Sequence, residues 1–327
     1  FIYLFSFVKM QNTHKIIIYS AIFAFALAIN VIFYSYYAFI ISLIIGGISL
    51  SGRDLTPNQP IEQYAIGMYE GTQKSKNMAF SVYNFLSYGA GVIASAFLFL
   101  FRGNDFRMIF AVILALSLVQ LILYLPIKFP QNRQVKAVDL NADTRKHVSV
   151  LSVLFSMDAF GGGLVTSSII SLWFKDIYLI SLSTAGLIFI FVNAITAVSV
   201  IISGLISGKI GLIRTMVYTH GISNVFLMLV PVIHSLAISE VFLFLRQTTS
   251  QMDVPARDSL VNSIIEPDYR IKSNSIFASV RNGFQIPGPG LAGYFLSIYP
   301  PLVFIFSGAV KLSYDLSLYF KYRNLKI

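Results

Sequence analysis

Long apolar runs alternate with short polar segments along most of the 327 residues. Only 12% of the residues are charged, about half the usual share in soluble domains. Inside a bilayer, every backbone N–H and C=O group must be paired within the chain, so an apolar run of about 20 residues folds as a helix. The mean hydropathy of +0.74 therefore predicts an all-α membrane protein with many spans.

Hydropathy predicts ten full spans and the end of one more. Residues Phe1 to Val8 are typical of the end of a helix that starts earlier, so we expect that the first helix and part of the second are missing. The expected full spans are about 16–28, 35–51, 78–101, 108–127, 149–174, 184–207, 212–230, 236–251, 273–297 and 302–320.

The stretch Gln251–Tyr294 has a counterpart 198 residues earlier in the chain. Pro255 aligns with Pro57, and Lys272-Ser273 aligns with Lys74-Ser75, without a gap. Both copies are a polar segment followed by a long apolar helix, which indicates an internal duplication. We therefore predict two six-helix halves in parallel repeat: a transmembrane half over 1–127, a linker over 128–148 and a second transmembrane half over 149–327.

The distribution of Lys and Arg orients the predicted spans. Eighteen of the 24 lie in segments that alternation places on the side of the linker, three lie on the opposite side, and three lie inside spans. This positive-inside bias makes the linker and the C-terminus cytoplasmic, in a plasma-membrane protein. The bias also explains the net charge of +10 as topology, so we expect no nucleic-acid partner.

A short basic segment carries a resemblance to a known family. The run from Gly204 to Arg214, with Gly208-Lys209 and Gly211 inside it, resembles the cytoplasmic loop motif of the major facilitator superfamily, although Gly208 stands where an acid is usual. Its first-half equivalent, Lys9 to Lys15, has lost the glycines and the acid. The runs RTMVYTHGISN and QMDVPARDSLV are similar to prokaryotic permeases of that superfamily.

The resemblance implies a secondary active transporter that moves a small-molecule solute by alternating access. We expect it to act as a monomer in the lipid bilayer, with coupling to protons as a hypothesis. The alternative is a non-transporting protein, either a degenerate permease or a membrane sensor, because the first-half motif is degraded and the start is missing.

Ionisable and polar residues inside spans are the candidates for substrate binding or proton coupling, because a charge at membrane depth is costly. Asp158 lies about nine residues into its span, and Gly161 and Gly162 share its face, which places it in the protein interior. Arg281, with Gln285 one turn on, either contacts an anionic substrate or holds Asp158. Asn193 lines a cavity or bonds a neighbouring helix. The alternative for Asp158 is a structural acid paired with an arginine.

Other candidates lie near the cytoplasmic side or in the last spans. Arg246 is close enough to the predicted end of its span to extend to the surface, or to form a gate with Asp253; Arg257 belongs to the same predicted loop. Lys311 and Asp315, one turn apart, form a predicted self-neutralising pair.

A proline–glycine run predicts a bend. The run Pro287-Gly288-Pro289-Gly290 removes backbone donors and should break its helix. It resembles the Gly-Pro motif of antiporting facilitators, which normally lies in the first half, where Tyr88-Gly-Ala-Gly91 has no proline. The alternative is a hinge or a tight packing site.

Signatures of soluble enzymes are missing from the sequence. The chain has no cysteine, which excludes thiolate metal and redox sites. Its four histidines are scattered, and Gly208-Lys209 is followed by Ile210, which has no hydroxyl for Mg²⁺. We predict no catalytic residue, metal or cofactor, and no enzymatic activity.

Overall fold

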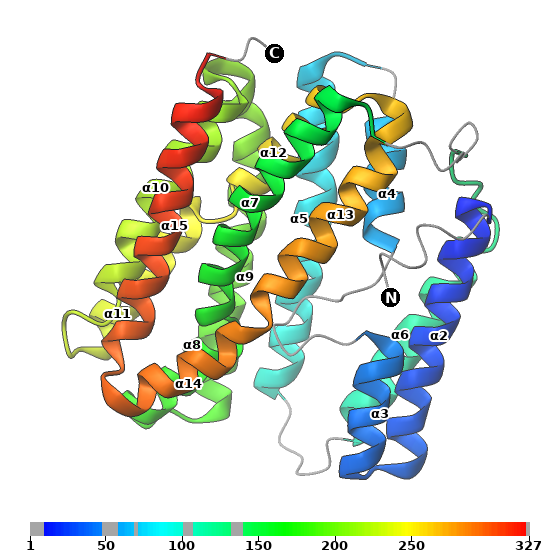
Figure 1. Cartoon of the computed structure of the whole chain (residues 1–327). Coiled ribbons are helices and arrows are strands. Elements are labelled where there is room, and N and C mark those ends of the chain that lie inside the picture. The colour runs from blue at the N-terminus through cyan, green and yellow to red at the C-terminus, as the bar shows by residue number, and fades with distance from the viewer. Residues whose placement is uncertain (1–9, 48–57, 69–70, 101–106, 132–139, 325–327) are drawn as a thin grey trace.

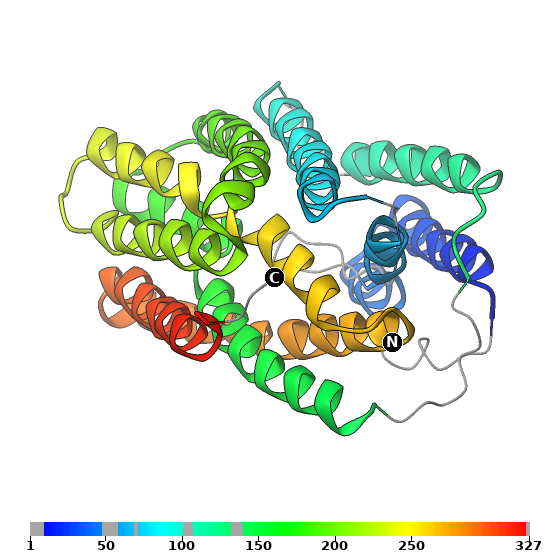
Figure 2. The ribbon, with the colours of Figure 1, turned by 90° about the horizontal axis from the view of Figure 1, so that it is seen from above.

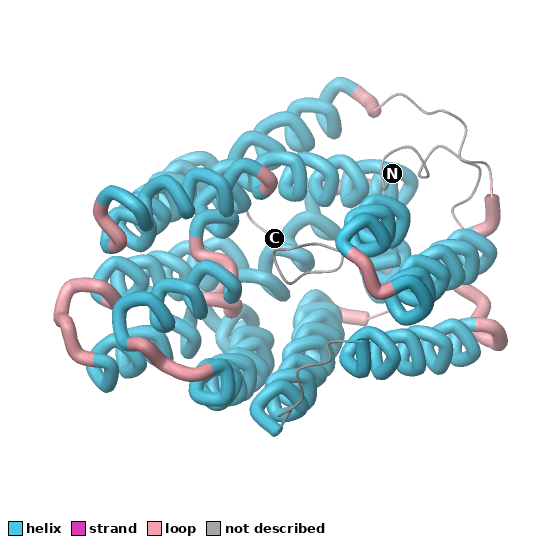
Figure 3. The backbone as a smooth tube through the Cα atoms, turned by 90° about the horizontal axis from the view of Figure 1, so that it is seen from below, coloured by secondary structure: helices cyan, strands magenta, loops and turns pink. Residues whose placement is uncertain are grey.

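The structure is a computed structural model, and it describes residues 10–47, 58–68, 71–100, 107–131 and 140–324. Within these ranges the regular elements are helices, and most of them run roughly side by side (Figure 1, Figure 3). The predicted helix end at Phe1–Val8, the turn at 102–105 and the central part of the linker, 132–139, lie outside the described residues.

We call helices α2–α6 the first half and helices α7–α15 the second half. The first half contains α2 (Asn12–Phe33), α3 (Tyr36–Gly46), α4 (Asn58–Gly67), α5 (Gln73–Leu100) and α6 (Arg107–Tyr124). The second half contains α7 (Ala142–Leu164), α8 (Ser167–Tyr178), α9 (Leu182–Ile210), α10 (Leu212–Leu229), α11 (Leu236–Thr249), α12 (Asp253–Ile264), the 3₁₀ turn η1 (Pro267–Tyr269), α13 (Arg270–Gln285), α14 (Pro287–Ile298) and α15 (Pro301–Tyr322).

The predicted fold class, an all-α membrane protein, is confirmed. Six helical stretches are long and apolar enough to cross a membrane: Asn12–Phe33, Lys74–Leu100, Arg107–Tyr124, Ala142–Tyr178, Ser183–Ile210 and Pro301–Tyr322. The predicted span at 273–297 is divided between α13 and α14, and the one at 236–251 is α11, which α12 follows to form a second divided span. Charged and polar side chains lower the hydropathy of these divided spans.

Two segments that we predicted as polar loops contain helices. The described part of 52–77 contains α4, and 253–272 contains α12. In α12, Leu260 and Val261 are buried against the second-half core, and in α4, Ile61 and Tyr64 are buried. The prediction was wrong because the polar residues of these helices also face inward, so hydropathy does not distinguish them from solvent-exposed loops.

The order and spacing of the helices repeat between the halves. Helix α5 ends at residue 100 and α14 at 298, and α6 ends at 124 and α15 at 322, so each pair is separated by 198 positions. Helices α2, α3 and α4 correspond in the same way to α10, α11 and α12. The repeat seen in the sequence is thus matched, helix by helix, in the structure.

Helices α5 and α9 run antiparallel along one another and join the two halves (Figure 2). A Cβ atom on Gly204 would lie 2.5 Å from Ser81 Oγ, and one on Gly186 would lie 3.1 Å from the backbone N of Phe99. Between these points, Asn193 donates a hydrogen bond to Ser95 Oγ at 3.0 Å. Small residues therefore allow close contact along the whole seam.

The predicted bend in the proline–glycine run is confirmed. Helix α13 ends at Gln285 and α14 begins at Pro287. At this break the chain crosses α7 with backbone against backbone: a Cβ atom on Gly163 would lie 2.6 Å from the Gln285 carbonyl oxygen, and one on Gly288 would clash with the backbone of Gly163. Gly288 is therefore required by the crossing.

We expect Gly288→Ala to destabilise the protein by about 1–3 kcal/mol, because the added methyl group overpacks a backbone contact. Thermal unfolding of the detergent-solubilised protein measures the effect. The matched control is Gly290→Ala, two residues on, where a Cβ atom would meet no atom within 4 Å. Equal melting temperatures for the two variants would contradict the close crossing.

Candidate functional site

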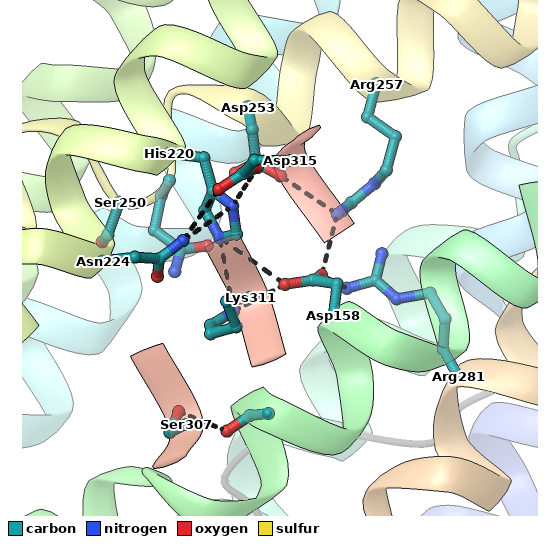
Figure 4. A network of polar contacts seen from close by, with 12 residues as sticks. Asp158, His220, Asn224, Ser250, Asp253, Arg257, Arg281, Ser307, Lys311 and Asp315 are labelled. Atoms are coloured by element: carbon teal, nitrogen blue, oxygen red, sulfur yellow. Dashed lines mark hydrogen bonds and ion pairs between the residues drawn. The ribbon is translucent and has the colours of Figure 1, made fainter. Parts of the chain in front are cut away.

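A layer of charged side chains lies between two apolar clusters of the second half. The cluster that contains Leu151, Phe155 and Leu318 lies on one side, and the cluster that contains Trp173 and Phe304 lies on the other. We call the residues between them the polar layer. Its members come from five helices and are Asp158 (α7), His220 and Asn224 (α10), Asp253 and Arg257 (α12), Arg281 (α13), and Lys311 and Asp315 (α15), as Figure 4 shows.

Asp158 is the centre of the polar layer and is surrounded by basic groups. Lys311 Nζ donates a hydrogen bond to Asp158 Oδ1 at 2.6 Å. Two guanidinium groups approach the other carboxylate oxygen, Oδ2: Arg281 Nη2 at 3.5 Å and Arg257 Nη1 at 3.8 Å. His220 Nε2 lies 3.5 Å from Oδ1. Three basic side chains thus share one buried carboxylate.

His220 connects Asp158 to a second carboxylate. Its Nδ1 lies 2.7 Å from Asp315 Oδ1, and its Nε2 lies 3.3 Å from the Lys311 ammonium group. An ammonium group can only donate, so Nε2 accepts and Nδ1 carries the proton that is donated to Asp315. Asn224 Nδ2 donates to the other Asp315 oxygen at 2.9 Å. With this tautomer His220 bridges the Lys311 ammonium group and the Asp315 carboxylate.

Arg257 has a second carboxylate partner on its own helix. Its Nη1 donates to Asp253 Oδ2, one turn away, at 3.3 Å. The guanidinium group also lies over the ring of Phe155, with 5.7 Å between Cζ and the ring centroid. Since both Arg257 and Asp253 are buried, α12 contributes a neutral pair to the polar layer and presents one end of that pair to Asp158.

Small residues make room for the Lys311 side chain. A Cβ atom on Gly161 would lie 2.7 Å from Lys311 Cγ, and Ser307 Oγ donates to the Gly161 carbonyl oxygen at 2.7 Å. Helices α7 and α15 therefore approach closely beside Asp158. This is the arrangement expected from the glycines one turn after Asp158.

The structure tests where several of the predicted residues lie. Asp158 is 5% exposed, so the prediction that it faces the protein interior is confirmed. Arg281 lies within ion-pair distance of Asp158, which was one of its two predicted roles; the other was contact with an anionic substrate. The predicted Lys311–Asp315 pair is wrong: the two side chains share a helix face, but Lys311 bonds Asp158 while Asp315 bonds His220 and Asn224.

The predicted positions of Arg246, Asp253 and Arg257 are corrected. Arg246 is 8% exposed and does not extend to the surface, because α12 continues beyond α11 and places Arg246 in the middle of the divided span. Asp253 and Arg257 are buried in α12 and not in a solvated loop. Asp253 pairs with Arg257, so the predicted gate between Arg246 and Asp253 is replaced by this ion pair.

The remaining predicted residues lie outside the polar layer. Asn193 bonds across the α5–α9 seam, and Gln285 packs on Gly163 at the bend. In the loop motif, Lys209 and Arg214 are exposed and Gly208 faces Lys74. Gly211 connects α9 to α10 and has a φ of +87°. This left-handed backbone conformation favours glycine.

Sequence analysis missed His220 and Asn224. They are one turn apart on α10 and therefore share a face, which is the signal that could have drawn attention to them. Their partner Asp315 is 91 or more residues away in the chain, so nothing local indicates the contact. Within the described ranges, no group of three or more His, Cys, Asp and Glu residues could hold a metal ion.

Comparison with solved structures identifies the architecture. The chain is similar to the human organic anion transporter MFSD10, with a TM-score of 0.74, 16% identity, and coverage of 94% of this chain and 77% of that one. It is also similar to a variant of the Escherichia coli fucose:proton symporter FucP, with a TM-score of 0.69, 11% identity, and coverage of 96% and 84%. A bacterial homologue of the iron transporter ferroportin in an outward-facing state gives a TM-score of 0.64, 13% identity, and coverage of 96% and 84%.

The chain has the major facilitator superfamily fold. The prediction of that architecture is confirmed, and the polar layer lies in the second half of this facilitator fold.

No family model matches the sequence. The uncharacterised membrane protein YJR124C of Saccharomyces cerevisiae is 28% identical over 191 residues, or 58% of this chain. The chain spans less than half of that relative, 42% of its length, and the prokaryotic origin suggested by the motifs stays a prediction.

The polar layer should be held together by mutual charge compensation. We expect Asp158→Asn to lower the free energy of unfolding by about 3–5 kcal/mol, because it leaves buried cations uncompensated. The double variant Asp158→Asn/Lys311→Met should recover part of this loss, since it removes one of those cations. Thermal unfolding of the four proteins of this double-mutant cycle measures the coupling. Additive effects of the two substitutions would contradict direct pairing.

Proposed function

We propose that the protein is a secondary active transporter that moves a small-molecule solute across a membrane by alternating access. The observation that carries the proposal is the polar layer: a carboxylate shared by Lys311, Arg257 and Arg281 inside a fold of this type. Burying so many charges costs stability, and in membrane proteins such groups mark solute or ion pathways. The named transporters of the same fold support this reading.

The packing between the halves supports alternating access. Apart from the α5–α9 seam, the main packing of first-half on second-half helices in the described chain involves α4 and α5 with α12 and α13. There Ser259 Oγ of α12 donates to Asn77 Oδ1 of α5. The Asn77 Nδ2 group donates in turn to Ser207 Oγ of α9, on the seam itself, at 3.3 Å. Arg270 Nη1 donates to the Gly67 carbonyl oxygen at 3.4 Å. We infer that this end of the molecule is closed and opens during transport.

The membrane orientation follows from the same proposal. The closed end is the one at which α7 begins after the linker, and the positive-inside rule makes that side cytoplasmic. The transporter would then face outward, in the plasma membrane, with the linker and C-terminus in the cytoplasm. The first and second halves, divided by the linker at 128–148, would rock as units about the α5–α9 seam, and the protein would act as a monomer.

We further propose that Asp158 couples transport to protons. In the structure its carboxylate holds Lys311 on α15 and Arg281 on α13. A proton on Asp158 would remove the charge that attracts both, and His220 could then share its Nε2 more fully with Lys311. Helices α7, α13 and α15 would loosen together, which is a physical link between proton binding and movement of the halves.

The test of coupling is solute uptake by proteoliposomes with an imposed pH gradient. A solute identified by screening should accumulate faster with a gradient than without one, and Asp158→Asn should remove this dependence while solute exchange across the membrane continues. The control is Asn193→Ser, in which a polar residue of the seam is replaced by another. Unchanged dependence on the pH gradient in Asp158→Asn would exclude Asp158 as the coupling group.

The closed end can be tested by cross-linking, because the chain has no native cysteine. We expect the double variant Asn77→Cys/Ser259→Cys to form a disulfide on oxidation and to lose transport, since α5 and α12 must separate. The pair Ser95→Cys/Asn193→Cys, on the seam that should act as the axis, is expected to cross-link with transport largely retained. Measurements are gel mobility and uptake before and after reduction. Full transport by the oxidised Asn77→Cys/Ser259→Cys variant would contradict the proposed movement.

A further inference from the structure

Arg246 differs from the cations of the polar layer because no carboxylate neutralises it. Lys311, Arg257 and Arg281 each lie within 4.0 Å of Asp158. Among the described residues, Arg246 has no carboxylate within that distance. Its Nη1 donates to Gln247 Oε1 at 2.8 Å, and its Nε is buried without an acceptor. A guanidinium group that is only 8% exposed and lacks a counter-charge is costly to bury.

Arg246 lies where the two halves meet near mid-depth of the molecule. It is near the end of α11, and α12 adds another 12 residues after the break. At this break Tyr88 of α5 donates to Gln251 Oε1 at 2.6 Å, which joins the first half to the second. Arg246 interacts electrostatically with both Tyr88 and Asp158. This is the position, at the interface of the repeats, where transporters built from repeats bind their solutes.

The side chain that bonds Arg246 is polar and uncharged. Ser250 Oγ donates to Gln247 Oε1 at 2.8 Å, so this amide oxygen already accepts from both Arg246 and Ser250. The remaining guanidinium donors therefore have no carboxylate in the described chain to bond. Guanidinium groups pair best with carboxylate and phosphate groups, which accept two parallel hydrogen bonds.

We propose that Arg246 binds the anionic group of the transported solute, and hence that the substrate is a small organic anion. This inference rests on the proposed transport function. An anion bound to Arg246 would neutralise the buried charge and would also repel the nearby Asp158 carboxylate. Anion and proton would therefore enter more favourably together than separately, which links Arg246 to the coupling proposed for Asp158.

The first experiment measures anion binding by the purified protein. Melting temperatures are recorded with carboxylates and their uncharged analogues, benzoate against benzamide and succinate against succinamide, and with glycerol 3-phosphate against glycerol. We expect at least one anion, but not its uncharged partner, to raise the melting temperature of the wild type. Arg246→Gln should weaken this binding by about 10–100-fold, since a charge-assisted hydrogen bond is lost, and Arg246→Lys should retain part of it.

Two further variants separate binding from folding. Arg246→Met replaces an unpaired buried charge with a side chain of similar length, so we expect it to melt at or above the wild-type temperature without solute and to lose anion binding. The control Arg145→Gln removes an exposed arginine of α7 and should bind anions as the wild type does. Anion binding by Arg246→Met or Arg246→Gln at wild-type affinity would overturn the proposal.

Uptake into proteoliposomes distinguishes a wrong substrate class from a wrong function. Uptake of an anion by the wild type, with loss in Arg246→Gln, supports both proposals. Uptake of the uncharged analogues alone, unchanged in Arg246→Gln, overturns the anion proposal and leaves the transport function standing. If the wild type moves neither anions nor uncharged analogues and no anion raises its melting temperature, both proposals fail.

Discussion

The charge on Asp158 determines how the second half is packed. One carboxylate, 5% exposed, forms ion pairs with basic groups from α12, α13 and α15, and the arginine of α12 also pairs with Asp253. In a low-dielectric interior each of these cations would otherwise cost several kcal/mol. The ion pair between Lys311 and Asp158 requires small residues at 161 and 307, because the Lys311 side chain passes between α7 and α15 at this point. Packing and charge compensation are therefore one constraint on these helices.

Hydropathy predicted the helices that contain long apolar runs. The expected spans at 78–101, 184–207 and 302–320 correspond to α5, α9 and α15 with small shifts at the ends. The failures, α4 and α12, are helices whose polar residues face other helices and not water. Hydropathy measures what a side chain is and not what it contacts, so Asp253 and Arg257 read as loop residues although each neutralises the other inside the protein.

The candidate site could be predicted only in part. Asp158 and Arg281 attracted attention because single charges in apolar runs are rare, and the glycines one turn after Asp158 indicated that it faces the interior. The pairing itself was not predictable: Lys311 has Asp315 one turn away, yet its hydrogen bond goes to Asp158, 153 positions earlier in the chain. Helical spacing permits the local pair, but His220 bonds Asp315 and leaves the ammonium group to Asp158. Tertiary contacts outweighed the local rule.

The two halves share a helix order but not a charge distribution. At a separation of 198 positions, His220, Lys311 and Asp315 correspond to Ile22, Ile113 and Ser117, which cannot form an ionic network. Among the described residues, the ion pairs of the polar layer are therefore made by side chains of the second half. The two halves can differ in their charged residues because the buried charges of the polar layer find their partners within the second half. The first half contributes polar contacts to the second, through Asn77 and Tyr88 of α5.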